Sequence, residues 1–581
     1  MDMVNIKING MPLSVPKEST VLEAARYAGI DIPTLCFLKD LNQIGACRMC
    51  VVEVKGARSL VASCVYPVNE GMEVFTNTPK VQKSRKMTLE LLLSVHDRNC
   101  LACKRSGNCE LQTLCNQLGV DQSDHFDGAK PAAEKDESTL HLVRDNGKCI
   151  VCRRCVAACA DQHVGVIGTN SRGFDTHIGC AFEHPLSDVT CVGCGQCIVN
   201  CPTGALTEHD QCADVLAVLN DPEKTVIVQT APAIRATLGE CFGMPIGTNV
   251  KGKMVAALHR LGFDKVFDTD FGADLTIVEE ANELIERIQN NGPLPLITSC
   301  SPGWVKFCEH YYPELLPNVS SCKSPQQMTG AMIKTWYAQK NNLDPKNIVV
   351  VSVMPCTAKK FEVQRDDQNA AGAGIQDVDI AITTRELARL INLAQINFAR
   401  LPDEEFDSAM GVTTGAAAIF GATGGVMEAA LRTAADTLEG KSLDSVEYEA
   451  VRGTEGTKEA LYQIAGMNVK VAVVSGLNNA NELLNKVKNG KADYQFIEIM
   501  CCPGGCVNGG GQPIQPASVR NFTDLKAERA KALYEEDQNL TLRKSHESPI
   551  VKLAYEEFLG KPGSHKAHEV LHTTYVARKK Y

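Results

Sequence analysis

The pattern of hydrophobic positions divides the chain into a thiol-rich N-terminal part and a longer C-terminal part. From about Gln211 onward, short continuous apolar runs alternate with stretches of helical periodicity. Such runs, rich in Val and Ile, are typical of strands buried on both faces of a sheet. We therefore predict an α/β domain with strands in TVIVQTAP, PLIT, NIVVVSVMP, DIAITT, VAVVSG and YQFIEIM, and we expect the charged C-terminal residues 521–581 to form helices packed against it.

The first residues of the chain alternate apolar and polar positions instead. VNIKINGMPLSV contains Asn9-Gly10, which predicts a hairpin with a two-residue turn. Thr20 and Glu23 have the spacing of a capping box, so we expect a helix after Thr20. A second apolar helical stretch is expected over Met87–Val95.

Composition changes this picture mainly through cysteine. The 581 residues allow several domains, the net charge is -10, and no basic run suggests a nucleic-acid surface. No window approaches eighteen uninterrupted apolar residues and the N-terminus lacks a secretory pattern, so we expect a cytoplasmic protein without a membrane span. In that reducing compartment, disulfides are not expected. The 26 cysteines, most of them in tight groups, are better explained as metal ligands.

The first thiol group has the spacing C-x10-C-x2-C-x13-C. One CxxC flanked by two lone cysteines is closer to the plant-type 2Fe-2S ferredoxin arrangement than to a zinc knuckle, which usually pairs two CxxC turns. The first interval departs from the plant spacing, so the strand-rich ferredoxin fold is carried here by resemblance. The four expected ligands are Cys36, Cys47, Cys50 and Cys64.

The second group, HDRNCLACKRSGNC, places one imidazole and three thiols at the spacing H-x3-C-x2-C-x5-C. A zinc site also accepts this set, and the histidine could be a surface residue beside three cysteines. The neighbouring motifs favour a 4Fe-4S cluster. Its ligands would be His96, Cys100, Cys103 and Cys109, while Cys115 is expected to pack in the core.

A weakly patterned charged stretch predicts a linker, and two copies of C-x2-C-x2-C-x3-C follow it. In two-cluster bacterial ferredoxins the fourth cysteine of each run ligates the cluster of the other run. We therefore predict two 4Fe-4S clusters. One is held by Cys149, Cys152, Cys155 and Cys201, and the other by Cys191, Cys194, Cys197 and Cys159. The first run has Ala160 where the second has Pro202, which affects a turn and not a ligand.

Three strand-end loops of the C-terminal part also carry thiols. They read TSCSPGW, MPCTAKKFE and EIMCCPGGCVNGGGQP, and a fourth strand ends in Thr230-Ala231-Pro232. Ligands of α/β folds gather at the carboxyl ends of strands, so these loops could meet in one crevice. The many glycines of the last loop would let its backbone approach a large inorganic group. Cys180, Cys212, Cys241, Cys308 and Cys322 lack partners at ligand spacing and are expected in the core.

Together these three loops resemble the signature loops of the iron-only FeFe-hydrogenases, and with the ferredoxin-like modules the resemblance covers essentially the whole chain. It implies an H-cluster, in which a 4Fe-4S cube shares one cysteine with a two-iron centre bearing CO, cyanide and azadithiolate. Cys356, Cys502 and Cys506 would ligate the cube, Cys506 would be the bridge, and Lys359 would hydrogen-bond a cyanide. The two-iron pocket would be lined by Ala231, Pro232, Gln326, Met354, Phe420 and Met500.

The first loop departs from the family pattern. TSCCP is usual, with the first cysteine relaying protons and the second ligating the cube, whereas this chain has Cys300 and then Ser301. Cys501 stands where alanine is common. Cys300 could shift to ligate the cube, Ser301 could ligate through oxygen, or Cys501 could compensate. Because thiolate is the better ligand for an iron cube, we expect Cys300 to be the ligand.

A helix with polar residues on one face supplies the expected proton path. LTIVEEANELIERIQNNGP has helical periodicity, and we expect it to be opened by Thr276 with Glu279 as a capping pair and closed at residues 290–293. By pattern alone, a solvated face with an ion pair is the simpler interpretation. The resemblance favours a proton path instead. Its members would be Glu280, Glu283, Arg287 and Ser320.

The sequence thus predicts a multidomain α+β and α/β chain. We expect a 2Fe-2S ferredoxin-like domain (1–79), a small 4Fe-4S domain with one histidine and three cysteine ligands (80–125), a linker (126–140), a two-4Fe-4S ferredoxin-like domain (141–210) and an H-cluster domain (211–581). The expected reaction is reversible proton reduction to hydrogen. Since no flavin or nicotinamide motif is present, the partner would be ferredoxin or a separate flavin-bearing NAD(P) subunit. A non-catalytic electron-transfer or hydrogen-sensing protein and a zinc scaffold are the alternatives.

Overall fold

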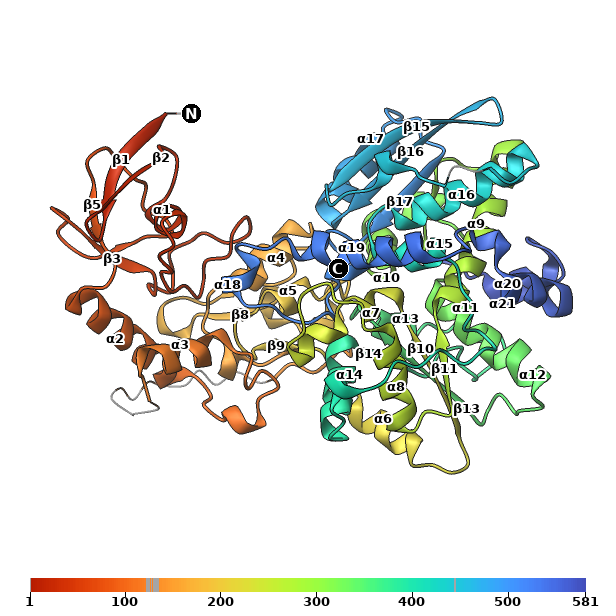
Figure 1. The fold of residues 1–581 in the computed structure, drawn as a ribbon, viewed down its shortest axis with the longest axis horizontal. Helices are drawn as coiled ribbons and strands as arrows, with labels where there is room; N and C mark the ends of the chain where they lie inside the picture. The colour runs from red at the N-terminus through yellow and green to blue at the C-terminus, as the bar shows by residue number, and fades with distance from the viewer. Residues whose placement is uncertain (1, 122–125, 127, 129–134, 444–445, 581) are drawn as a thin grey trace.

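The computed structural model describes residues 2–121, 126, 128, 135–443 and 446–580. Residues 127 and 129–134 of the expected linker, 126–140, therefore lie outside the described residues. In Figure 1 the N-terminal module lies at one end of the molecule, the cysteine-rich modules follow it, and the larger C-terminal domain occupies the other end. No helix among the described residues is both long and apolar enough to cross a membrane.

The N-terminal module is a small mixed sheet with the strand order β2-β1-β5-β3-β4. β1 (Met3–Ile8) and β2 (Met11–Pro16) form the predicted hairpin, and Asn9 and Gly10 of its turn both have positive φ. α1 (Val21–Tyr27) begins with the predicted capping box of Thr20 and Glu23. The other strands are β3 (Val51–Val54), β4 (Val61–Ala62) and β5 (Glu73–Phe75).

Short helices carry the next thiols. α2 (Pro79–Val95) contains the predicted stretch but starts eight residues earlier, because Thr78 caps it and Pro79 fits the first turn. α3 (Glu110–Leu118) follows the motif of one histidine and three cysteines. The duplicated motif is built on α4 (Arg154–Asp161) and α5 (Gln196–Val199), framed by the paired strands β6 (Val143–Arg144) and β9 (Leu206–Thr207).

A buried ion pair joins the three N-terminal modules. Arg154 of α4 is 1% exposed and donates to both carboxylate oxygens of Glu110, at 2.8 and 3.0 Å. The same guanidinium donates to the carbonyl of Phe37 at 3.0 Å. Because one cation serves groups from all three modules, its removal leaves a partly buried carboxylate without its ion pair at their junction.

The C-terminal domain contains two four-stranded sheets, with the orders β11-β10-β13-β14 and β12-β17-β16-β15. All the predicted strands form, and two more were missed. The first sheet is parallel and consists of β10 (Thr225–Thr230), β11 (Lys265–Asp268), β13 (Ile348–Met354) and β14 (Ile380–Thr383). The second consists of β12 (Leu296–Ile297), β15 (Thr457–Ile464), β16 (Met467–Ser475) and β17 (Phe496–Met500).

The helix α9 (Asp270–Gln289) corrects one prediction. Thr276 and Glu279 do not open it, since both lie inside it, and the Thr276 hydroxyl donates to the carbonyl of Gly272 at 2.8 Å. Glu279 instead accepts hydrogen bonds from the Tyr555 hydroxyl at 2.5 Å and from the Gly563 amide at 3.0 Å. The predicted end is confirmed, because Asn290 caps the helix C-terminally.

The C-terminal segment forms the predicted helices, α19 (Leu525–Asn539), α20 (Pro549–Ala554) and α21 (His565–Leu571). They cover the C-terminal domain, and the short α18 (Ala517–Arg520) reaches back beside α4 and α5 (Figure 1). There Arg520 donates to the carbonyl of Val199 at 2.8 Å. The residues just before this segment therefore contact the duplicated cysteine motif.

Candidate active site

The thiol-bearing loops meet at one cavity between the two sheets. The cavity measures about 60 Å³ and is mostly apolar. Cys300 follows β12, Cys356 follows β13 and Cys506 follows β17, so the expected convergence of strand ends is confirmed. All six residues expected in the pocket line it together with Lys359, namely Ala231, Pro232, Gln326, Met354, Phe420 and Met500.

Burial makes this a costly place for free thiolates. Desolvation raises the pKa of Cys506 to about 12, and the neighbouring thiol of Cys502 adds to the effect. Burial also raises the pKa of Cys356, again with Cys502 and Cys506 as neighbours. Three neighbouring buried thiols supply three of the four ligands that an iron-sulfur cube takes, and the iron ions would replace the lost hydration of the thiolates. The residues thus fit a cube.

The glycines of the third loop act on the neighbouring loops. A Cβ atom at Gly509 would lie 2.2 Å from the carbonyl oxygen of Pro355, and one at Gly510 would lie 2.3 Å from that of Cys194. Gly505 has φ 93° and would place a Cβ 2.7 Å from the Thr423 amide nitrogen. The loop therefore packs backbone to backbone against both the second thiol loop and the duplicated cysteine motif.

Lys359 is fixed at the cavity wall. It begins the short helix α13 (Lys359–Glu362), and its Nζ donates to the carbonyl of Cys300 at 3.3 Å and to Glu362 at 2.9 Å. The same Glu362 carboxylate accepts from Gln326 at 2.8 Å. Sequence reasoning missed Glu362 as a positioning residue, although its i+3 spacing from Lys359 is visible in the motif MPCTAKKFE.

The predicted proton path forms a row of polar groups beside the cavity. Glu280 is 1% exposed, and burial, with Glu283 as the next cause, raises the pKa of Glu280 to about 8. Glu283 accepts from the Ser320 hydroxyl at 2.8 Å and from Arg287 at 2.6 Å. Arg287 also donates to the carbonyl of Pro293 at the partly exposed end of α9. These hydrogen bonds join Arg287, Glu283 and Ser320, whereas both carboxylate oxygens of Glu280 are buried without a hydrogen-bond partner in the described structure, and Glu280 and Cys300 are linked only as electrostatic neighbours.

The first accessory thiol group also comes together. The Cys50 and Cys64 sulfurs lie 3.3 Å apart, and the Cys36 amide donates to the Cys47 sulfur at 3.4 Å. In the duplicated motif, the set predicted from the exchanged fourth ligand surrounds a small cavity, lined by Cys149, Cys152, Cys155 and Cys201. The other set is mutually close as well, with Cys159, Cys191 and Cys194 as neighbours of Cys197.

The group of one histidine and three cysteines is placed less tightly. Cys103 is an electrostatic neighbour of Cys109, and Cys115, which was expected in the core, is 9% exposed and adjoins Cys109 and Cys100. His96 is buried and caps the C-terminal end of α2, directly before the three thiols. Four of the five other cysteines expected in the core are buried and Cys241 is partly buried.

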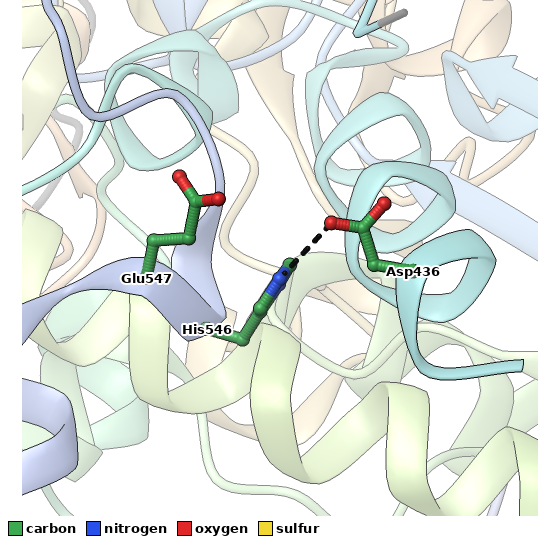
Figure 2. Close-up of side chains that lie close together, drawn as sticks. All are labelled: Asp436, His546 and Glu547. Atoms are coloured by element: carbon green, nitrogen blue, oxygen red, sulfur yellow. Dashed lines mark ion pairs between the residues drawn. The ribbon is translucent and has the colours of Figure 1, made fainter. Parts of the chain in front are cut away.

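One carboxylate-imidazole cluster outside the cavity resembles a cation site. Figure 2 shows Asp436, His546 and Glu547 with their ligand atoms close together. The Lys544 ammonium, however, donates to Asp436 at 2.7 Å, nearer than the His546 nitrogen at 3.2 Å. Since a lysine already neutralises Asp436, the cluster is an ion-pair network that joins the chain before α20 to α16 (Gly425–Glu439).

Protein-family models match nearly all of the chain. Residues 224–510 match the C-terminal domain of the iron only hydrogenase large subunit, and 523–578 match the iron hydrogenase small subunit. Residues 1–79 match a 2Fe-2S iron-sulfur cluster binding domain. Residues 85–124 match the NADH-ubiquinone oxidoreductase-G iron-sulfur binding region, and 148–206 match a 4Fe-4S dicluster domain.

Similar proteins agree with these matches. The chain is 49% identical to the NADP-reducing hydrogenase subunit HndD of Solidesulfovibrio fructosivorans, over 100% of both chains. It is 46% identical to iron hydrogenase 1 of Clostridium pasteurianum, over 99% of this chain and 100% of that one. A solved variant of the [FeFe]-hydrogenase HydA1 from Chlamydomonas reinhardtii covers 64% of this chain and 100% of its own, with 42% identity and a TM-score of 0.57. The chain is a member of the iron-only, or [FeFe], hydrogenases.

Proposed function

We propose that this hydrogenase interconverts hydrogen with protons and electrons at an H-cluster in the cavity between the two sheets. The observation that carries the proposal is the meeting of Cys356, Cys506 and Lys359 with six mainly apolar residues around that cavity. Cys356, Cys502 and Cys506 would hold the cube, with Cys506 as the bridge to the two-iron centre. When bound, that centre supplies the hydrogen-binding and redox chemistry.

The protein itself would contribute three things. The apolar wall, which includes Met354, Phe420 and Met500, excludes water from the bound group. Lys359, oriented by Glu362, presents a cation at the cavity edge, where it would hydrogen-bond an anionic ligand such as cyanide. Glu280, with its pKa raised to about 8 by burial, can hold or release a proton near neutral pH.

Protons would follow the row on α9. Glu283, held by Arg287 at the partly exposed end of the helix, would exchange protons with solvent, and Ser320 is hydrogen-bonded to Glu283. Glu280 would pass the proton between this pair and Cys300, whose thiol lines the cavity.

Electrons would travel through one 2Fe-2S and three 4Fe-4S clusters in the N-terminal modules. The best-supported contact for electron transfer lies between the duplicated motif and the active-site loop. The side-chain amide of Gln196 donates to the carbonyl of Asn508 at 3.1 Å, and Gly510 packs against Cys194. The cluster of Cys191, Cys194, Cys197 and Cys159 would therefore be the one next to the cube.

The external partner would be a flavin-bearing NAD(P) subunit, ferredoxin, or both. The 49% identity over the full length to an NADP-reducing hydrogenase subunit supports the first. Cytoplasmic placement would suit either partner, because a reducing compartment keeps the cluster-binding thiols reduced.

The test uses the isolated chain with the H-cluster assembled. Under hydrogen we expect it to reduce a 2×4Fe-4S ferredoxin or a viologen dye but not NAD+ or NADP+, since a flavin is needed to combine single electrons from the clusters into a hydride for the nicotinamide. Addition of the flavin-bearing subunit should restore nicotinamide reduction. Direct nicotinamide reduction by the isolated chain would contradict the assignment of a separate flavin subunit.

A further inference from the structure

We propose that Cys501, rather than Ser301 or Cys300, supplies the fourth thiolate of the cube held by Cys356, Cys502 and Cys506. A 4Fe-4S cube takes four protein ligands, and the three loops provide only three cysteines without a competing assignment. The inference rests on the proposed function, because it concerns the cluster that this function requires. It replaces the prediction that Cys300 fills the position.

Ser301 and Cys501 face each other, although 200 residues separate them. The Ser301 side-chain oxygen accepts a hydrogen bond from the backbone amide of Cys501 at 3.1 Å. Ser301 precedes α10 (Pro302–Tyr311) but makes no side-chain cap bond to it, so its hydroxyl is directed to the end of β17 instead. Compared with the family pattern, this chain lacks a thiol at position 301 and has an additional one at position 501. These two residues are in direct contact.

The Cys501 side chain lies among the ligands of two clusters. It is 3% exposed and within side-chain hydrogen-bonding reach of Cys502 and Cys194. Cys502 belongs to the cube, and Cys194 belongs to the adjacent accessory cluster. A buried thiol with two expected ligand sulfurs as neighbours is placed to donate to iron, whereas the serine hydroxyl is a hard and poorly matched donor.

Gly303 provides the space for this sulfur. A Cβ atom at position 303 would lie 2.7 Å from the Cys501 Sγ and 3.2 Å from its Cβ. Real Cβ atoms do not approach sulfur so closely, so any larger residue at 303 would displace Cys501. The first loop thus has Ser301 in place of the family's cube-ligating cysteine. Its Gly303 leaves space for the Cys501 side chain of the third loop.

Cys300 is directed elsewhere. Its side chain lines the apolar cavity, and its electrostatic neighbours are Glu280, Cys506 and Lys359. This places it at the inner end of the α9 row. With Cys501 as the fourth ligand, Cys300 stays free to exchange protons. When iron binds Cys501, an Fe–S bond forms and the thiol proton passes to water.

The test compares Cys501→Ala, Ser301→Ala and Cys300→Ala with the double variant Ser301→Cys/Cys501→Ala. Each full-length protein is produced with 57Fe but without the two-iron centre, and iron content and Mössbauer spectra are recorded. In Cys501→Ala we expect the loss of at least about one cube iron per chain, or one iron with a non-thiolate signature. The double variant should restore the wild-type spectrum, and Ser301→Ala and Cys300→Ala should keep it.

An unchanged cube spectrum in Cys501→Ala would overturn the inference, and so would an altered cube spectrum in either Ser301→Ala or Cys300→Ala. The signals of the accessory clusters in the same samples report correct folding. The two proposals fail differently. A wild-type chain without any cube would refute the proposed function, whereas a wild-type cube that survives Cys501→Ala refutes only the ligand assignment.

Discussion

Replacing Glu280 by Gln should separate proton transfer from cluster binding. Glutamine keeps the shape and a hydrogen-bonding end but cannot carry a proton to Cys300. Positioned acid-base groups contribute about 100- to 10,000-fold to rates, so hydrogen turnover should fall by at least about 100-fold. Cluster content should be unchanged, because Glu280 lies in α9 and is not a ligand.

The same substitution has a signature in stability. The folded Glu280 keeps its proton up to a pKa of about 8, because burial raises that pKa from 4.5. Between these values the folded chain binds more protons than the unfolded one, so stability falls as pH rises through this window. The full interval corresponds to roughly 5 kcal/mol of unfolding free energy. In Glu280→Gln that loss should be absent.

The assay combines hydrogen evolution with thermal unfolding of the C-terminal domain between pH 5 and pH 9. Glu286→Gln is the matched control, because Glu286 is an exposed glutamate of the same helix. It should leave both the turnover and the pH dependence of the melting temperature unchanged. The account of the α9 row is refuted if Glu280→Gln turns over at the wild-type rate or melts with the wild-type pH dependence.

Two substitutions test how the site is supported. Gly509→Ala should destabilise the active-site loop by about 1–3 kcal/mol or more, because its Cβ would lie 2.2 Å from the Pro355 oxygen. Calorimetry should show no such loss for the control Gly168→Ala, where no atom lies within 4 Å of the added Cβ. Arg154→Ala should cost up to about 3 kcal/mol at the junction of the N-terminal modules, since the partly buried Glu110 would lose its ion pair. Limited proteolysis of Arg154→Ala should then release residues 1–79 sooner than proteolysis of the control Lys55→Ala, which removes an exposed ion pair. Equal protection of the two variants would contradict the role of Arg154.

Much of the fold was readable because the buried strands of parallel sheets are continuous apolar runs. β13 and β17 are buried at every position and were predicted. β15 was missed because it alternates buried and exposed residues, and β11 because it is a four-residue strand with a charge at each end. The start of α9 was misplaced because Gly272 interrupts the helical pattern. A Cβ there would meet the Pro325 oxygen at 2.3 Å, which is a tertiary contact that no local pattern reveals.

The candidate site shows the same division. The family resemblance predicted which residues line the cavity, because the motifs that carry it are local. The contact between Ser301 and Cys501 could not be predicted from spacing, since it joins residues from two loops 200 positions apart. The same holds for the close approach of Gly510 to Cys194, which brings an accessory cluster motif against the active-site loop. Both contacts depend on the packing of segments far apart in the sequence.

The most direct test of the central claim is hydrogen evolution by the chain with an assembled two-iron centre and reduced methyl viologen as the electron donor. We predict sustained turnover in the wild type and loss of both turnover and the infrared bands of bound CO and cyanide in Cys506→Ala, which lacks the bridging thiol. A fully loaded wild-type chain that evolves no hydrogen, or a Cys506→Ala variant that retains the bands and the rate, would contradict the account.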